Sequence, residues 1–108
     1  MNKFCDVSIS LVNDVWIKQL HFPVKGMIAN THAHTHDHQT LLAVGSLKVT
    51  VMGHETIHRA PDILLIHAGA YHKLEALEAG TVAYCIHALR DGASVVKDID
   101  NDAVHLAL

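Results

Sequence analysis

The sequence has no cluster of basic residues. Eight Lys and Arg stand against eleven Asp and Glu, which gives a formal net charge of −3, and the basic residues are scattered along the chain. A protein that follows a phosphate backbone needs its Lys and Arg gathered on one surface. Nucleic acid is therefore not an expected partner.

Long apolar runs are also missing. No stretch approaches the roughly 20 apolar residues of a membrane-spanning helix, and the first residues, 1–6, lack the apolar core of a secretory signal. We expect a soluble, cytoplasmic protein with no membrane partner. The only cysteines, Cys5 and Cys85, lie far apart and offer no disulfide framework, so both thiols are expected to be reduced.

The apolar residues nowhere keep the three-to-four-residue period of a long helix. Short apolar runs alternate with turn signals instead, which predicts an all-β barrel. A chain of 108 residues that is 50% hydrophobic can bury one core. We therefore expect a single domain over residues 1–108, with its core at about residues 20–90 and a C-terminal extension over 91–108.

Eight strands are expected, with hairpin turns at 45–46 and 52–54. They cover residues 14–22, 27–34, 40–44, 47–52, 55–59, 63–67, 72–77 and 81–89.

Histidine is what the sequence has in excess. Four of the eleven histidines, His32, His34, His36 and His38, occupy alternate positions in one short segment. Imidazole is the commonest side-chain metal ligand, and alternate residues of a strand point to the same side. A straight strand advances about 3.3 Å per residue, which would separate His32 from His38 by roughly 20 Å. Either the strand bends after His34 or only two of the four bind one ion; a solvated polar strand or an adventitious metal binder is the competing interpretation.

The spacing around this cluster resembles the first motif of the cupin family. Gly26, His32, His34, His38 and Gly45 stand at the motif's positions, with His38 where cupins usually carry Glu. The family's second motif is similar to residues 61–76, where His72 is the matching histidine. This segment departs from the motif at three positions, with Pro61 in place of glycine, His67 in place of proline and Ala76 in place of the closing asparagine.

The resemblance implies a cupin-like double-stranded β-helix, or jelly-roll barrel. It also implies a metal ion bound by His32, His34, His38 and His72. His36 falls outside the ligand pattern and is interpreted as an exposed or supporting imidazole, and His67 as a structural or pocket-lining residue. The remaining histidines outside the last strand are interpreted as surface residues: His21, His54, His58 and His105.

Four neutral imidazoles leave two positions of an octahedral ion open to water, oxygen or a small chelating substrate. Fe or Mn is favoured as the cofactor, and Ni, Cu and Zn also suit imidazole. The resemblance to metal-dependent cupin dioxygenases implies oxygen chemistry. The alternatives are a non-redox isomerase or lyase, a non-catalytic small-molecule-binding or sensing protein, and metal storage. The two motifs are short of an acid or base, since their only carboxylates are Asp37, Asp62 and Glu75.

The last expected strand carries three further pocket candidates, Tyr84, Cys85 and His87. Strand alternation places Tyr84 on one face and Cys85 with His87 on the other. One set faces the barrel interior, and the sequence does not decide which.

Cupins commonly pair through their sheets, so the resemblance also implies a homodimer. The segment 7–20, which alternates apolar and polar residues, is the expected exchanged or edge-pairing element. Light scattering on a size-exclusion column checks this expectation, because a monomer at micromolar concentration would contradict it.

Overall fold

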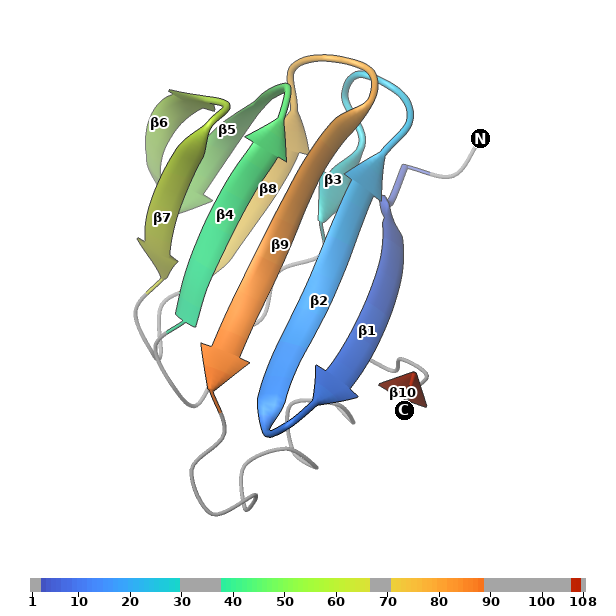
Figure 1. The fold of residues 1–108 in the computed structure, drawn as a ribbon. Coiled ribbons are helices and arrows are strands. Elements are labelled where there is room, and N and C mark those ends of the chain that lie inside the picture. The colour runs from blue at the N-terminus through green and yellow to red at the C-terminus, as the bar shows by residue number, and fades with distance from the viewer. Residues whose placement is uncertain (1–2, 30–37, 67–70, 89–105, 108) are drawn as a thin grey trace.

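Two β-sheets face each other and enclose the core. The computed structural model describes residues 3–29, 38–66, 71–88 and 106–107, which form ten strands and no helix. The strands are β1 (Asp6–Val12), β2 (Val15–Phe22), β3 (Ile28–Ala29), β4 (His38–Val44), β5 (Ser46–Val51), β6 (His54–Arg59), β7 (Asp62–Ile66), β8 (His72–Ala76), β9 (Thr81–Ala88) and β10 (Leu106–Ala107). Figure 1 shows the larger sheet in front of the smaller one.

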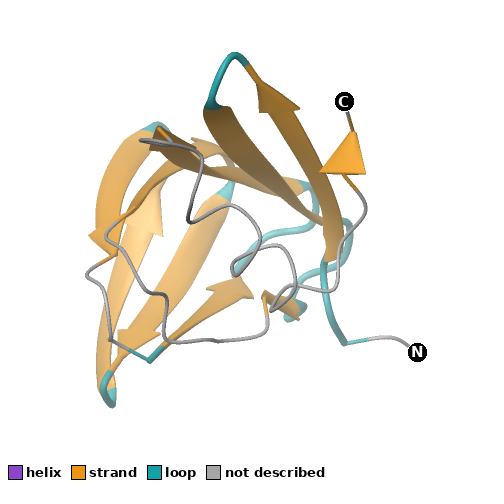
Figure 2. Cartoon of the chain, turned by 90° about the horizontal axis from the view of Figure 1, so that it is seen from below, coloured by secondary structure: helices purple, strands orange, loops and turns teal. Residues whose placement is uncertain are grey.

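The chain passes back and forth between the two sheets, which gives the double-stranded β-helix. The larger sheet has the order β10-β1-β2-β9-β4-β7 and the smaller one β3-β8-β5-β6. From β2 onward the chain changes sheet at almost every connection, and strands far apart in sequence pair, such as β2 with β9 and β5 with β8. The two layers are visible from below in Figure 2. The all-β jelly-roll prediction is confirmed.

Alternation along each strand places the core between the sheets. In β2, Trp16, Leu20 and Phe22 are buried, whereas the residues between them are partly exposed. The buried set also includes Cys5 and Ile9, so the core starts well before residue 20 and the predicted range of 20–90 was too short. Residues 106–107 of the expected C-terminal extension also join the larger sheet as β10.

The N-terminal segment forms a hairpin that the sequence prediction did not divide correctly. Asn13 and Asp14 have φ angles of 49° and 63°, so they form a two-residue turn between β1 and β2, and the strand expected from residue 14 begins at Val15. On its other side β1 pairs with β10 through Ile9 and Ser10. The edge expected to pair in a dimer is therefore partly covered by the chain itself.

The predicted turn at 52–54 is a two-residue turn at Met52 and Gly53, whose φ angles are 50° and 83°. The strand expected over 27–34 is described only as β3, Ile28–Ala29, since residues 30–37 lie outside the described part of the chain. Among the residues that are described, none belongs to a helix able to cross a membrane.

Candidate functional site

His72 lies on the inner face of the smaller sheet. Three alternate residues of β8, His72, Leu74 and Ala76, are buried, and His72 retains 8% of its exposure. Its neighbour in β5 is Val51, and the next residues on that inner face, Val49 and Leu47, are buried as well. The predicted ligand from the second motif therefore faces the barrel interior.

Of the other predicted ligands, the structure describes only the backbone of His38. His32 and His34, like His36 and His67, lie outside the described residues, and His38 is the first residue of β4, paired in register with Ile66. No group of three metal-binding side chains occurs among the residues that the structure describes, which leaves out this segment. Ala29 pairs with Leu74, so the chain leaves β3 beside the strand that carries His72 and enters the larger sheet at His38.

The structure selects one face of β9 for the interior. Ala83 and Cys85 are buried at 0% and 6% exposure, and alternation places His87 on their side of the strand. Tyr84 therefore lies on the opposite face, toward the outside of the barrel. Of the three pocket candidates in this strand, Cys85 and His87 face inward and Tyr84 does not.

Trp16 adds an inward-facing donor that sequence reasoning missed. It pairs in register with His87, retains 3% exposure, and its Nε1 is buried with no hydrogen-bond partner among the described residues. A buried unpaired N–H costs about 1–3 kcal/mol. Only the alternation of β2 could have indicated that Trp16 faces the same interior as His87.

The two cysteines are buried thiols. Cys85 Sγ lies 3.5 Å from Thr40 Oγ1, and burial raises the pKa of Cys5 to about 11 despite the opposing charge of Lys18. Only a thiolate attacks an alkylating reagent. Cys85 is a buried core side chain beside Thr40.

We expect both thiols to resist iodoacetamide at pH 8 in the folded protein. For Cys5, the rise in pKa from 9.0 to about 11 lowers the thiolate fraction near that pH by about 100-fold. Burial blocks access of the reagent to both cysteines. Mass spectrometry should find no adduct in the folded protein and two after denaturation in urea. Rapid alkylation of either cysteine before denaturation would contradict their burial.

A hollow of about 300 Å³ opens between β6 and β7, the end strands of the two sheets. Most of its lining is apolar and comes from Val49, Val51, Ile63, Leu64 and Leu65. Its polar lining consists of Thr56 and His58. Val51, in turn, pairs with His72, so the hollow lies beside the strand of the predicted metal ligand.

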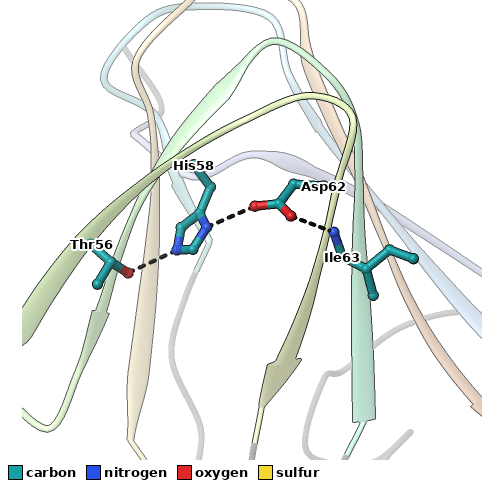
Figure 3. A network of polar contacts seen from close by, with 4 residues as sticks. All are labelled: Thr56, His58, Asp62 and Ile63. Atoms are coloured by element: carbon teal, nitrogen blue, oxygen red, sulfur yellow. Dashed lines mark hydrogen bonds and ion pairs between the residues drawn. The ribbon is translucent and has the colours of Figure 1, made fainter.

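His58 is not the simple surface residue that the sequence suggested. Its side chain is 25% exposed, and Nδ1 lies 2.9 Å from Asp62 Oδ2 while Nε2 lies 2.8 Å from Thr56 Oγ1. Figure 3 shows the three side chains in line between β6 and the start of β7. The hydrogen bond from His58 holds the pKa of Asp62 below its usual range. The only sequence signal was the spacing of His58 and Asp62 on either side of Ala60 and Pro61.

A second, smaller hollow lies at the end of β5 and β8. Its volume is about 170 Å³, and Met52, Tyr71 and His72 are among its lining residues. The Met52 N–H donates to the Tyr71 carbonyl at 3.1 Å, which joins the turn after β5 to the residue before β8. His72 therefore borders a small hollow at this end of the described strands.

Solved cupin structures share this fold. KdgF from Halomonas sp. matches with a TM-score of 0.66 at 20% identity, covering 81% of this chain and 81% of that one. A cupin superfamily protein from Desulfitobacterium hafniense matches with 0.68 at 14% identity, covering 83% of this chain and 82% of that one. A protein with a double-stranded β-helix domain from Klebsiella pneumoniae matches with 0.68 at 21% identity, covering 80% and 77%.

No family profile matches the sequence, and no curated protein does either. At identities of 14% to 21%, likeness to these structures establishes the fold and not an activity. The chain has the double-stranded β-helix fold of cupins.

Proposed function

We propose that this protein is a small metal-binding cupin that acts on a small, metal-chelating organic substrate. The ligands in this proposal are His32, His34, His38 and His72. The observation that carries it is the position of His72, which is buried on the inner face of β8 next to the strand that lines the larger hollow.

The donor set fits a divalent transition metal. Neutral imidazoles suit Fe, Mn, Ni, Cu and Zn, and we favour Fe or Mn. When bound, the metal would supply a Lewis acid that polarises a chelated carbonyl or hydroxyl and, in the case of Fe, chemistry with oxygen. A dioxygenase is the reaction class that the motif resemblance favours.

The chain's own residues would bind and orient the substrate. The apolar side chains of the larger hollow, Val49, Val51 and Leu64 among them, exclude water and suit a hydrocarbon group. A compact molecule with an apolar part and adjacent oxygens is the expected substrate.

Metal content and oxygen uptake test the proposal. The protein is purified without a histidine tag from cells supplied separately with Fe, Mn, Ni and Zn, and bound metal is measured by elemental mass spectrometry. We expect about one Fe or Mn ion per chain, with oxygen consumption that depends on an added dicarbonyl or catechol.

Other outcomes separate the alternatives. One tight ion without oxygen uptake would move the function to a non-redox isomerase or lyase, or to a binding protein. Several weak ions per chain, or much less than one, would contradict the proposed site and favour metal storage or adventitious binding.

A further inference from the structure

A second group of chemically coupled side chains lies at the larger hollow. Thr56 Oγ1 is 2.8 Å from His58 Nε2, and His58 Nδ1 is 2.9 Å from Asp62 Oδ2. The other carboxylate oxygen of Asp62, Oδ1, accepts the Ile63 backbone N–H at 2.9 Å. Both ends of the carboxylate are therefore held, and the imidazole is fixed between it and a hydroxyl (Figure 3).

The positions of the hydrogen atoms in the Thr56–His58–Asp62 network follow from the hydrogen-bond partners of His58. The hydrogen bond from His58 favours the ionised form of Asp62 and lowers the pKa of that carboxyl, and an ionised carboxylate can only accept. In its neutral form the imidazole therefore carries its hydrogen on Nδ1, next to Asp62. Its Nε2 is left as an acceptor, so the Thr56 hydroxyl donates to it. This is the order of a hydroxyl, a base and a group that orients the base.

We propose that Thr56, His58 and Asp62 form a nucleophilic acyl-transfer site for small esters with a short apolar acyl chain. Thr56 is the nucleophile, His58 the general base and acid, and Asp62 the residue that positions His58. This site shares the larger hollow with the proposed metal-bound substrate, but it uses none of the predicted metal ligands and does not require the metal.

The position of Thr56 and the side chains that line the hollow beside it indicate the class of substrate. Thr56 is exposed and lines the hollow together with apolar side chains of β5 and β7, including Val49 and Leu64. A volume of about 300 Å³ is at the lower end for ligand pockets, which suits a short acyl chain. β6 and β7 are the end strands of their sheets in the described part of the chain. Backbone N–H groups along such edges can donate to the oxyanion.

The reaction proceeds in two balanced steps. The Thr56 oxygen attacks the ester carbonyl carbon while its proton moves to His58 Nε2; the bond to the alcohol oxygen then breaks, and the leaving oxygen takes that proton. Water next attacks the Thr56 acyl ester, gives its proton to His58 Nε2, and the proton returns to the Thr56 oxygen as the acid leaves. The sum is ester plus water giving acid plus alcohol.

The full chain, stripped of metal with EDTA, is treated with p-nitrophenyl butanoate. We expect nitrophenolate release and one butanoyl group on Thr56, located by peptide mass spectrometry after acid quenching. Thr56→Val and His58→Gln should abolish the adduct, whereas Thr56→Ser keeps a hydroxyl and should retain it. Asp62→Asn should lower the acylation rate by at least about 100-fold with the fold intact, because it disturbs the hydrogen position on His58.

His21→Gln is the matched control. His21 also faces an aspartate, with Nδ1 3.6 Å from Asp6 Oδ2, but this pair is exposed, and among the described residues no side-chain hydroxyl is given a hydrogen bond to His21. It should acylate like the unmodified protein. Absence of an adduct on Thr56 in the unmodified protein would overturn the proposal, as would an adduct that persists in His58→Gln. Hydrolysis that EDTA abolishes and that leaves no adduct would assign the activity to the metal site and also overturn it.

Discussion

Replacing His72 with alanine is expected to lower the affinity for the divalent metal by more than about tenfold. His72 is the one predicted ligand whose side chain is described, and it is buried on the inner face of β8. Removing it takes away one of the four imidazoles that we propose as metal ligands, and apolar neighbours such as Val51 cannot replace it. Competition with a chromogenic chelator measures the change in dissociation constant.

Two other histidines provide the controls. His36→Ala should change the affinity little, because His36 stands outside the motif's ligand positions. His54→Ala should also have little effect, because His54 is an exposed residue of β6. Equal losses in His36→Ala and His72→Ala would refute the assignment of His36. Retained stoichiometric binding in a variant lacking His32, His34 and His72 together would remove the proposed site altogether.

Circular dichroism and urea unfolding must accompany the His72 measurement. A buried side chain is being truncated, and a cavity at this position can destabilise the fold without any metal being involved. If the metal-free variant unfolds at the same urea concentration as the metal-free parent protein, its lower metal affinity reflects the loss of a ligand. If the affinity instead falls in proportion to the fraction of unfolded protein, the loss reflects destabilisation of the fold.

Local features of the sequence indicate the inward position of His72, whereas its role as a metal ligand stays a prediction. The motif spacing places it, and the alternation of His72, Leu74 and Ala76 in β8 indicates one buried face. Its inward direction follows because apolar residues share that face. The same reasoning correctly predicted the all-β fold, since each strand carries its own pattern of apolar residues and turns.

His58 could not be predicted in this way because its surroundings depend on pairing between strands. β6 is mostly exposed and has no clear apolar face of its own. Only its register with β5, where His58 pairs with the fully buried Leu47, shows that His58 lies on the inner side. Asp62 then reaches it because β7 begins directly after the turn at residues 60–61. Likewise, only the register of β2 with β9 places Trp16 beside His87.

Replacing Gly45 with alanine is expected to destabilise the fold by about 2–5 kcal/mol. Gly45 has a φ angle of 86°, a conformation that costs other residues about 1–2 kcal/mol. A Cβ at this position would press against Thr81 Oγ1 and lie 2.9 Å from the Thr81 Cα. Thr81 is fully buried at the start of β9, so it cannot move aside freely, and such overpacking costs about 1–3 kcal/mol more.

Gly53→Ala separates the two contributions. Gly53 has nearly the same φ angle, 83°, but a Cβ added there would meet nothing within 4 Å. It should therefore show only the conformational cost of about 1–2 kcal/mol.

Urea unfolding followed by the fluorescence of Trp16, the single tryptophan, measures both variants. Equal losses in the two would show that the contact with Thr81 adds nothing. A larger loss in Gly45→Ala would show that the contact with Thr81 adds to the conformational cost. Thr81 Oγ1 makes a 2.8 Å hydrogen bond to the Glu78 carbonyl, and a shift of Thr81 would break it, so the cost would spread to the turn before β9.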